Sequence, residues 1–233
     1  NMNKCYEFIE EEGYSPNIEG IKNYIKFWHK KLNPEYFMAS IPYDFKFDED
    51  NSNYGIENIL VPLSLELDLP IAFKFGTQRK LNPILRDAGD GAGESSVESL
   101  SNLCRKFNKT KFLATFLSQV NQHQLCVVAR KFGNLHIYGC WWFLNNPSLI
   151  EQITTMRIEM LGLGFTAQHS DSRILEQLLY KWKHSREIIK KVLIKKYNDI
   201  KETGWKLNEN QIRKDIWYLF RGSYEEFINK KLN

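Results

Sequence analysis

Two kinds of apolar segment alternate along the chain after residue 15. Short, almost uninterrupted apolar runs predict strands, and segments with apolar residues at helical spacing separate them. Strands this apolar are typical of a parallel sheet that is covered on both faces. The pattern therefore predicts an α/β protein whose parallel strands are joined through helices. The five predicted strands are residues 36–41, 71–75, 112–117, 135–142 and 165–169.

The predicted helices have recognisable ends. Pro34 follows the first of them and Gly133 follows the fourth, and both are helix stop signals. A long helix with an apolar stripe, 174–201, follows the last strand, and two shorter helices follow it. We expect residues 1–233 to form one domain or the C-terminal part of one, with 174–233 as its C-terminal helices. Besides 174–201, the predicted helices are 17–33, 56–67, 97–107, 122–132, 147–161, 208–219 and 224–232.

Two architectures fit this alternation, a (β/α) barrel and a doubly wound open sheet. Both place their chemistry at the carboxyl ends of the strands. The polar residues that follow each strand are therefore the candidates for a site.

Lys74 ends a strand that is otherwise apolar, and Trp141 and Trp142 end another. A buried lysine is typical of an anion-binding or catalytic role, but a lysine at a strand end also extends its ammonium into solvent. Tryptophan rings can form a wall against the face of a sugar, or they can pack in a core. The pattern alone leaves both alternatives open.

Asp171 and Arg173 follow the last predicted strand. Residues two apart on an extended segment point the same way, so these side chains can simply pair with each other. They can also form the mouth of a site, in which Arg173 binds a substrate carboxylate and Asp171 moves protons or binds a cation.

The long predicted loop 76–96 contains a glycine-rich stretch, 87–93. It lacks the spacing of a phosphate-binding loop, and its two aspartates would repel phosphate. We interpret it as a mobile lid with glycine hinges.

Composition narrows the function classes. The 233 residues carry a formal charge of +4, and 14 Lys and Arg against 7 Asp and Glu lie from Lys181 onward. We interpret this basic segment as a solvated helix face. The four cysteines lack CxxC spacing, which argues against a disulfide framework and favours the cytoplasm. Since no apolar run approaches the ~18 residues of a membrane span, we expect no membrane partner.

Two short motifs resemble the uronate (glucuronate) isomerase family of the amidohydrolase superfamily. They are Gly139-Cys140-Trp141-Trp142-Phe143 and, about thirty residues on, Ser170-Asp171-Ser172-Arg173. The similarity covers residues 17–230 and only the C-terminal half of a typical member. It implies a parallel (β/α) barrel of TIM type, with about five βα units that correspond to barrel strands four to eight.

The resemblance implies a function, the aldose–ketose isomerisation of hexuronates such as glucuronate and galacturonate. Asp171 matches the aspartate that ligates the metal and transfers protons, and Arg173 matches the arginine that contacts the substrate. Trp141 and Trp142 match the pair beside the sugar. Arg79 fits a family segment of the form H-x-G-x-x-R, in which Lys74 replaces the histidine.

The same resemblance implies a divalent metal, zinc or manganese, whose H-x-H ligands are absent from this chain. His29, His123, His136, His169 and His184 form no H-x-H pair, and Asp171 alone cannot hold a zinc ion. Because Asn1 precedes Met2 and the first barrel strands are missing, we expect an incomplete piece of such an enzyme, inactive alone.

Three hypotheses follow. The first is a uronate isomerase-like protein, an intramolecular oxidoreductase when complete, with a small-molecule uronate as its partner. The second is a non-catalytic half-barrel that binds a carbohydrate or an anion. The third, a nucleic-acid binder that uses 181–196, ranks last because no aromatic platform accompanies those charges. A five-stranded arc leaves two edges open, which other chain, a second copy or a rearrangement must cover.

Overall fold

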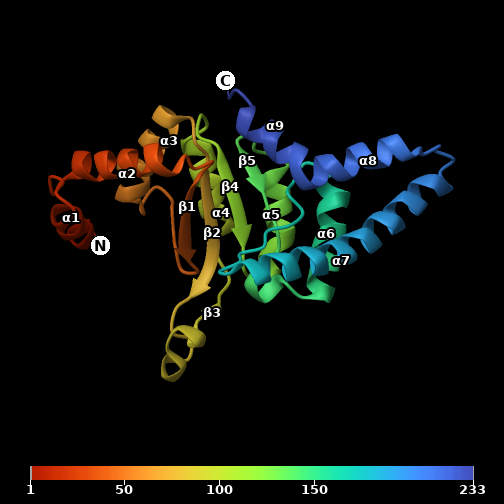
Figure 1. Ribbon diagram of the computed structural model, residues 1–233, viewed down its shortest axis with the longest axis horizontal. Helices are drawn as coiled ribbons and strands as arrows, with labels where there is room; N and C mark the ends of the chain where they lie inside the picture. Colours follow the sequence, from red (N-terminus) through yellow and green to blue (C-terminus); the bar gives the residue numbers. More distant parts are fainter. Residues whose placement is uncertain (1, 233) are drawn as a thin grey trace.

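Four parallel strands form the centre of the molecule. The computed structural model describes residues 2–232 of the chain. The strands lie in the order β1-β2-β4-β5, and a fifth, β3, pairs antiparallel with β2 (Figure 1). Their bounds are β1 (Phe37–Pro42), β2 (Ile71–Gln78), β3 (Gly91–Ala92), β4 (Phe112–Phe116) and β5 (Leu135–Ile137).

Nine α-helices surround this sheet in residues 2–232, and asparagine begins several of them. The side chains of Asn17, Asn146 and Asn208 each accept a hydrogen bond from the backbone three residues on. Within the described chain, no helix is both long and apolar enough for a bilayer. The helices are α1 (Met2–Glu11), α2 (Ile18–Leu32), α3 (Val61–Leu67), α4 (Val97–Lys106), α5 (Gln122–Ala129), α6 (Pro147–Leu161), α7 (Leu175–Glu202), α8 (Glu209–Trp217) and α9 (Ser223–Asn229).

The strand order decides between the two predicted architectures. The parallel strands follow one another in chain order, whereas a doubly wound sheet reverses its order at a switch point. The helices α3, α4, α5 and α6 also contribute to one core on one face of the sheet. The arrangement is that of a (β/α) barrel arc, so the parallel α/β prediction is confirmed.

The outer face of the sheet carries this core. Phenylalanines at alternate positions of β2 and β4 point toward the helices. The rings of Phe75 and Phe116 stack with centroids 4.5 Å apart. A neighbouring pair, Phe73 and Phe112, stacks at 5.9 Å. The aromatic ladder fixes the register of β2 against β4, and with it the place of every side chain on the opposite face.

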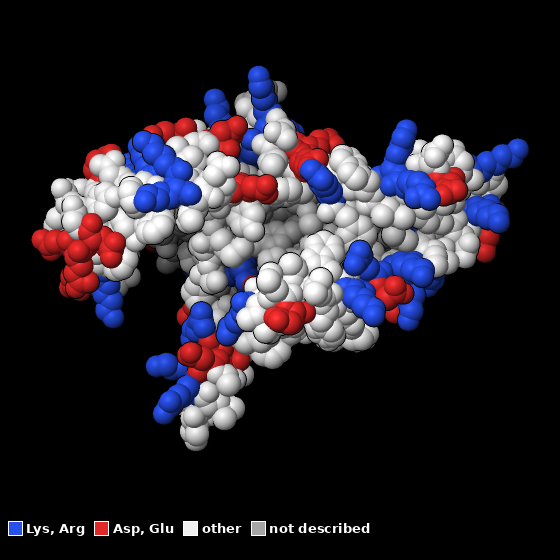
Figure 2. Space-filling view, viewed as in Figure 1, with Lys and Arg blue, Asp and Glu red and all other residues white. Residues whose placement is uncertain are grey.

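The inner face of the sheet is partly apolar and partly polar. Ala72, Leu113 and Tyr138 pack there against Phe227 of α9. The positions that share this face by alternation include buried Lys74 and His136. Figure 2 shows this side of the molecule hollowed over the sheet, between the N-terminal helices and the helices α7 to α9.

The structure differs from the sequence-based elements in five places. The strand predicted at 135–142 ends at Ile137, so Trp141 and Trp142 follow the strand instead of ending it. The strand predicted at 71–75 continues to Gln78, so Lys74 lies within it. The strand predicted at 165–169 is reduced to one bridge, Tyr138 to Thr166. The pairing ends at Gly139, whose φ of +53° is not that of a strand. A Cβ on Gly139 would lie 2.2 Å from the Cβ of His169, so the two segments touch here without forming a ladder. The predicted loop 76–96 contains the end of β2, a 3₁₀ turn and β3, which form an arm beyond the sheet (Figure 1). The helix α1 was not predicted.

Acid should destabilise the fold through His136. Burial, together with the charge of Arg157, lowers the pKa of His136 from 6.5 to about 4. The unfolded chain therefore binds a proton at higher pH than the folded chain, and stability is lost as the pH falls below 6.5. We expect a loss of about 2 kcal/mol in unfolding free energy between pH 7 and pH 5 from this residue.

Chemical denaturation of wild type and His136→Gln at both pH values measures this loss. The variant should lack that part of the pH dependence, and His123→Gln at an exposed position of α5 is the matched control. A variant with the full pH dependence of wild type would contradict the assignment.

Candidate functional site

Three of the predicted site residues meet at the carboxyl end of the sheet. Lys74 of β2 places its Nζ 2.5 Å from Oδ1 of Asp171. The same Nζ lies 4.0 Å from the centre of the Trp141 ring, a distance typical of a cation–π contact. The lysine side chain is only 8% exposed and the aspartate side chain 35%, so the carboxylate lies at the mouth of the site and the ammonium beneath it.

Unusual backbone geometry supports this cluster. Asp171 and Trp142 adopt left-handed φ values of +46° and +49°, which cost energy for residues other than glycine. At Asp171, the Nζ of Lys181 on α7 donates a hydrogen bond of 3.0 Å to the backbone carbonyl. This bond holds the turn that presents the carboxylate to Lys74.

A buried arginine positions the turn that leads to Trp141. Arg157 of α6 is 1% exposed and donates to the carbonyl of Gly139 at 2.8 Å and to Oε1 of Gln122 at 2.9 Å. The guanidinium thus binds neutral oxygens rather than a carboxylate. It fixes the backbone where the chain leaves β5, two residues before Trp141.

The charges of the cluster favour an ionised carboxylate. Burial raises the pKa of Asp171, but the hydrogen bond and the charge of Lys74 outweigh it, so the pKa lies below its ordinary value. At neutral pH, Asp171 is therefore a carboxylate paired with an ammonium.

His169 also belongs to this cluster, although it was not predicted as a site residue. Its Nε2 lies 3.8 Å from Oδ1 of Asp171, and its ring meets Tyr138 edge to face at 5.1 Å. Burial and the charge of Lys74 lower its pKa to about 4, so the imidazole is neutral at pH 7. The spacing His169-x-Asp171 was the available signal, because residues two apart on an extended segment share a side.

A cavity of about 200 Å³ lies beneath the cluster on the inner face of the sheet. His169 and Tyr138 line it together with Gln168. Each of the three has a buried polar side-chain atom without a hydrogen-bond partner among residues 2–232. Buried polar atoms of this kind require a partner, so the cavity suits water or the polar groups of a ligand.

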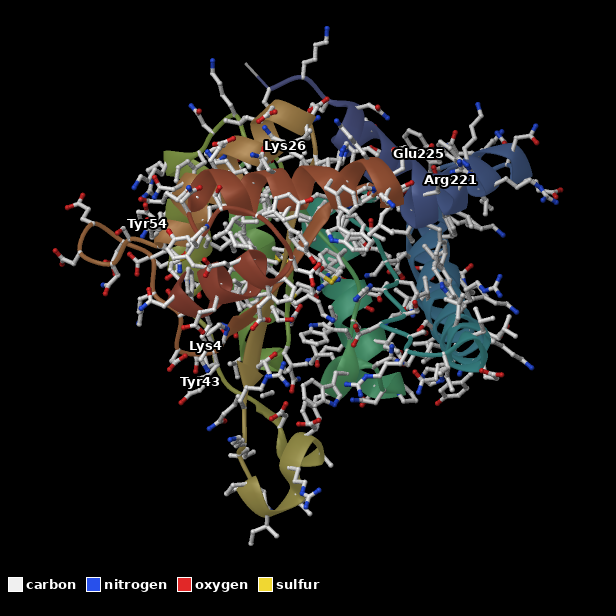
Figure 3. The ribbon with its side chains drawn as sticks, turned by 60° about the vertical axis from the view of Figure 1, so that its left-hand side comes forward. Lys4, Lys26, Tyr43, Tyr54, Arg221 and Glu225 are labelled. Atoms are coloured by element: carbon white, nitrogen blue, oxygen red, sulfur yellow. The ribbon has the colours of Figure 1, made fainter. Side chains whose placement is uncertain are left out.

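The other predicted site residues lie around the cluster rather than in it. Trp142 is 39% exposed and stacks on Phe143, and Arg173 is exposed. Arg79 lies on the arm, where its guanidinium pairs with Asp90. Tyr43 lies beside the base of this arm, and its backbone N–H donates to the carbonyl of Thr77 (Figure 3).

Comparison with solved structures places this geometry among known proteins. A uronate isomerase from Bacillus halodurans is 40% identical, with a TM-score of 0.92 over 98% of this chain and 56% of its own. The chain resembles the C-terminal half of a uronate isomerase. No protein-family model matches the chain, and no curated protein does.

Two more distant uronate isomerase structures share the fold. The Thermotoga maritima uronate isomerase is 16% identical, with a TM-score of 0.74 over 97% of this chain and 57% of its own. The Caulobacter crescentus glucuronate isomerase is 14% identical, with a TM-score of 0.78 over 99% and 56%. The chain thus spans a little over half the length of the uronate isomerases it matches.

The divalent metal implied by the uronate isomerase resemblance does not fit the residues of this cluster. Within residues 2–232, no group of three or more His, Cys, Asp or Glu side chains lies close enough to hold a metal ion. His169 and Asp171 supply two donors, and Lys74 is already bound to the carboxylate. A zinc site requires three or four ligands.

Replacement of Arg157 should destabilise the chain strongly. Arg157→Met removes the two hydrogen bonds that the guanidinium makes and leaves the Gly139 carbonyl and the Gln122 side chain buried without them. We expect the unfolding free energy to fall by about 2–4 kcal/mol. Chemical denaturation measures the loss, with Arg130→Met at an exposed position of α5's end as the control. Equal stabilities of the two variants would contradict the role of Arg157.

Proposed function

We propose that this chain is part of a uronate isomerase, which interconverts the aldose and ketose forms of hexuronates such as glucuronate and galacturonate. The observation that carries the proposal is the 40% identity to the Bacillus halodurans uronate isomerase over nearly the whole chain. The chemistry of the Lys74–Asp171–Trp141 cluster agrees with it.

The substrate has three features that this end of the sheet can recognise. Its carboxylate and hydroxyl oxygens suit cationic groups, for which we propose Lys74 and Arg173. Its ring carries C–H faces, for which we propose Trp141 and Trp142 as a wall. Arg79 now pairs with Asp90, so its proposed contact with anionic oxygens requires the arm to bring it to the sugar.

Aldose–ketose isomerisation moves a proton between two neighbouring carbons and another between their oxygens. We propose Asp171 as the group that moves these protons, because its lowered pKa keeps it a carboxylate at neutral pH. We propose Arg173 as the group that stabilises the oxygen on which negative charge develops. Asp171 was also predicted to ligate a metal, a role that the residues of this chain alone do not support.

A non-catalytic half-barrel that binds a uronate is the second candidate. The observation in its favour is that the described residues form no three-ligand metal group. Both candidates predict that uronate binds, but only the isomerase predicts that it is turned over.

Turnover tests the proposal directly. The assay compares this chain with a fusion that places before it the segment of the Bacillus halodurans uronate isomerase that this chain does not match. We expect the fusion to isomerise glucuronate or galacturonate and the chain alone to be inactive. Asp171→Asn in the fusion should reduce kcat at least about 1000-fold, because it removes the proposed base.

Asp199→Asn is the matched control, since Asp199 is exposed on α7 and its one ion pair within residues 2–232 is with Lys196. It should leave kcat within about twofold. Cooperative unfolding shows that the fusion is folded. A folded fusion that binds uronate but turns over neither sugar would favour the non-catalytic candidate.

A further inference from the structure

The ammonium of Lys74 lies between the Asp171 carboxylate and the Trp141 ring. It bonds to Oδ1 of Asp171 at 2.5 Å, and the Trp141 ring covers another side at 4.0 Å. An ammonium has three N–H donors, so a donor remains for a third group. The adjoining carboxylate side chain is 35% exposed, so the third group reaches the ammonium from the mouth of the site.

We propose that the Lys74 ammonium is the resident cation of this site, which occupies the Asp171 carboxylate in place of a divalent metal ion and binds an oxygen of an anionic sugar directly. The sugar class rests on the proposed function. The displacement of the metal rests on the geometry of the cluster alone.

A metal ion at Asp171 would have to displace or approach a buried positive charge. The Lys74 side chain is 8% exposed and its Nζ lies 2.5 Å from Oδ1, so a metal ion within bonding distance of Oδ1 would face this ammonium across a short gap. The Nζ of Lys181, which bonds to the carbonyl of the same aspartate, adds a second positive charge. Among residues 2–232, His169 is the remaining donor at the cluster, and one imidazole together with Asp171 does not complete a metal site.

The charges of this cluster attract an anionic oxygen, whereas they repel a metal ion. Lys74 and Lys181 together outnumber the single negative charge of Asp171, and neutral His169 adds none. The face of Trp141 stands next to the ammonium, where the C–H groups of a sugar ring can stack. A uronate offers both the anionic oxygens and such a ring.

The first experiment asks whether a metal ion reaches Asp171. It follows the indole N–H signal of Trp141 in the NMR spectrum of the whole chain, assigned through Trp141→Phe, as Mn²⁺ is added. We expect no selective broadening of this signal in wild type at equimolar Mn²⁺. Selective broadening that Asp171→Asn removes would overturn the proposal.

The second experiment asks whether Lys74 binds the sugar. Glucuronate is titrated against the same indole signal in the presence of a chelator. We expect wild type to bind without metal, Lys74→Arg to retain binding, and Lys74→Met to weaken it about tenfold or more, the loss typical of a charged hydrogen bond. Lys201→Met, at an exposed position on α7, should bind like wild type. Lys74→Gln repeats the test if Lys74→Met does not fold.

The outcomes separate this proposal from the proposed function. Metal-free binding that is unchanged in Lys74→Met and Lys74→Gln overturns the role of Lys74 and leaves the uronate class intact. Glucuronate binding that requires Mn²⁺ at Asp171 overturns the proposal that the Lys74 ammonium takes the place of the metal ion, and it also leaves the uronate class intact. Exclusion of Mn²⁺ from Asp171 without any glucuronate binding supports the displaced metal and contradicts the proposed substrate.

Discussion

The ion pair between Lys74 and Asp171 joins two parts of the chain that are 97 residues apart. Lys74 belongs to β2 at the centre of the sheet, whereas Asp171 follows the last bridge of the sheet and precedes α7. A buried ammonium without this carboxylate would be costly, so the pair fixes where the segment after Thr166 must lie. The place of the candidate site is thus a consequence of satisfying one buried charge.

Other parts of the structure make this pair attainable. The phenylalanine ladder on the outer face fixes the register of β2 against β4 and so points Lys74 inward. Gly139, with its left-handed φ, lets His169 approach the end of β5 closely. Arg157 holds the carbonyl of Gly139, and Lys181 holds that of Asp171. Arg157 of α6 and Lys181 of α7 therefore act on the site by binding backbone carbonyls beside it.

Much of the fold followed from the sequence because apolar runs and helical spacing are local signals. The strands β1, β2 and β4 and the helices between them lie close to their predicted positions. The fourth strand was predicted too long, and the fifth, 165–169, forms only one bridge, since the close contact at Gly139 is a tertiary effect that no local pattern carries. The helix α1 was missed for a similar reason, because its buried contacts lie in other segments. The arm was missed although its strands pair within it, because its glycine-rich and charged sequence carries no strand pattern.

The site was only partly predictable. Lys74, Trp141 and Asp171 were found as strand-end residues, but nothing in their spacing indicated that Lys74 would bind Asp171. Arg79 was expected beside them, whereas Asp90, eleven residues on, holds it on the arm. His169 was considered only as a metal ligand and was set aside because the five histidines form no H-x-H pair.

A crystal structure of this chain with glucuronate, grown with a chelator, tests the central claim most directly. The account predicts a sugar oxygen within hydrogen-bond distance of the Nζ of Lys74, the sugar ring against Trp141, and Asp171 still paired with the lysine. Glucuronate bound away from Lys74, or Lys74 turned out of the cluster with the sugar bound to Asp171, would contradict it.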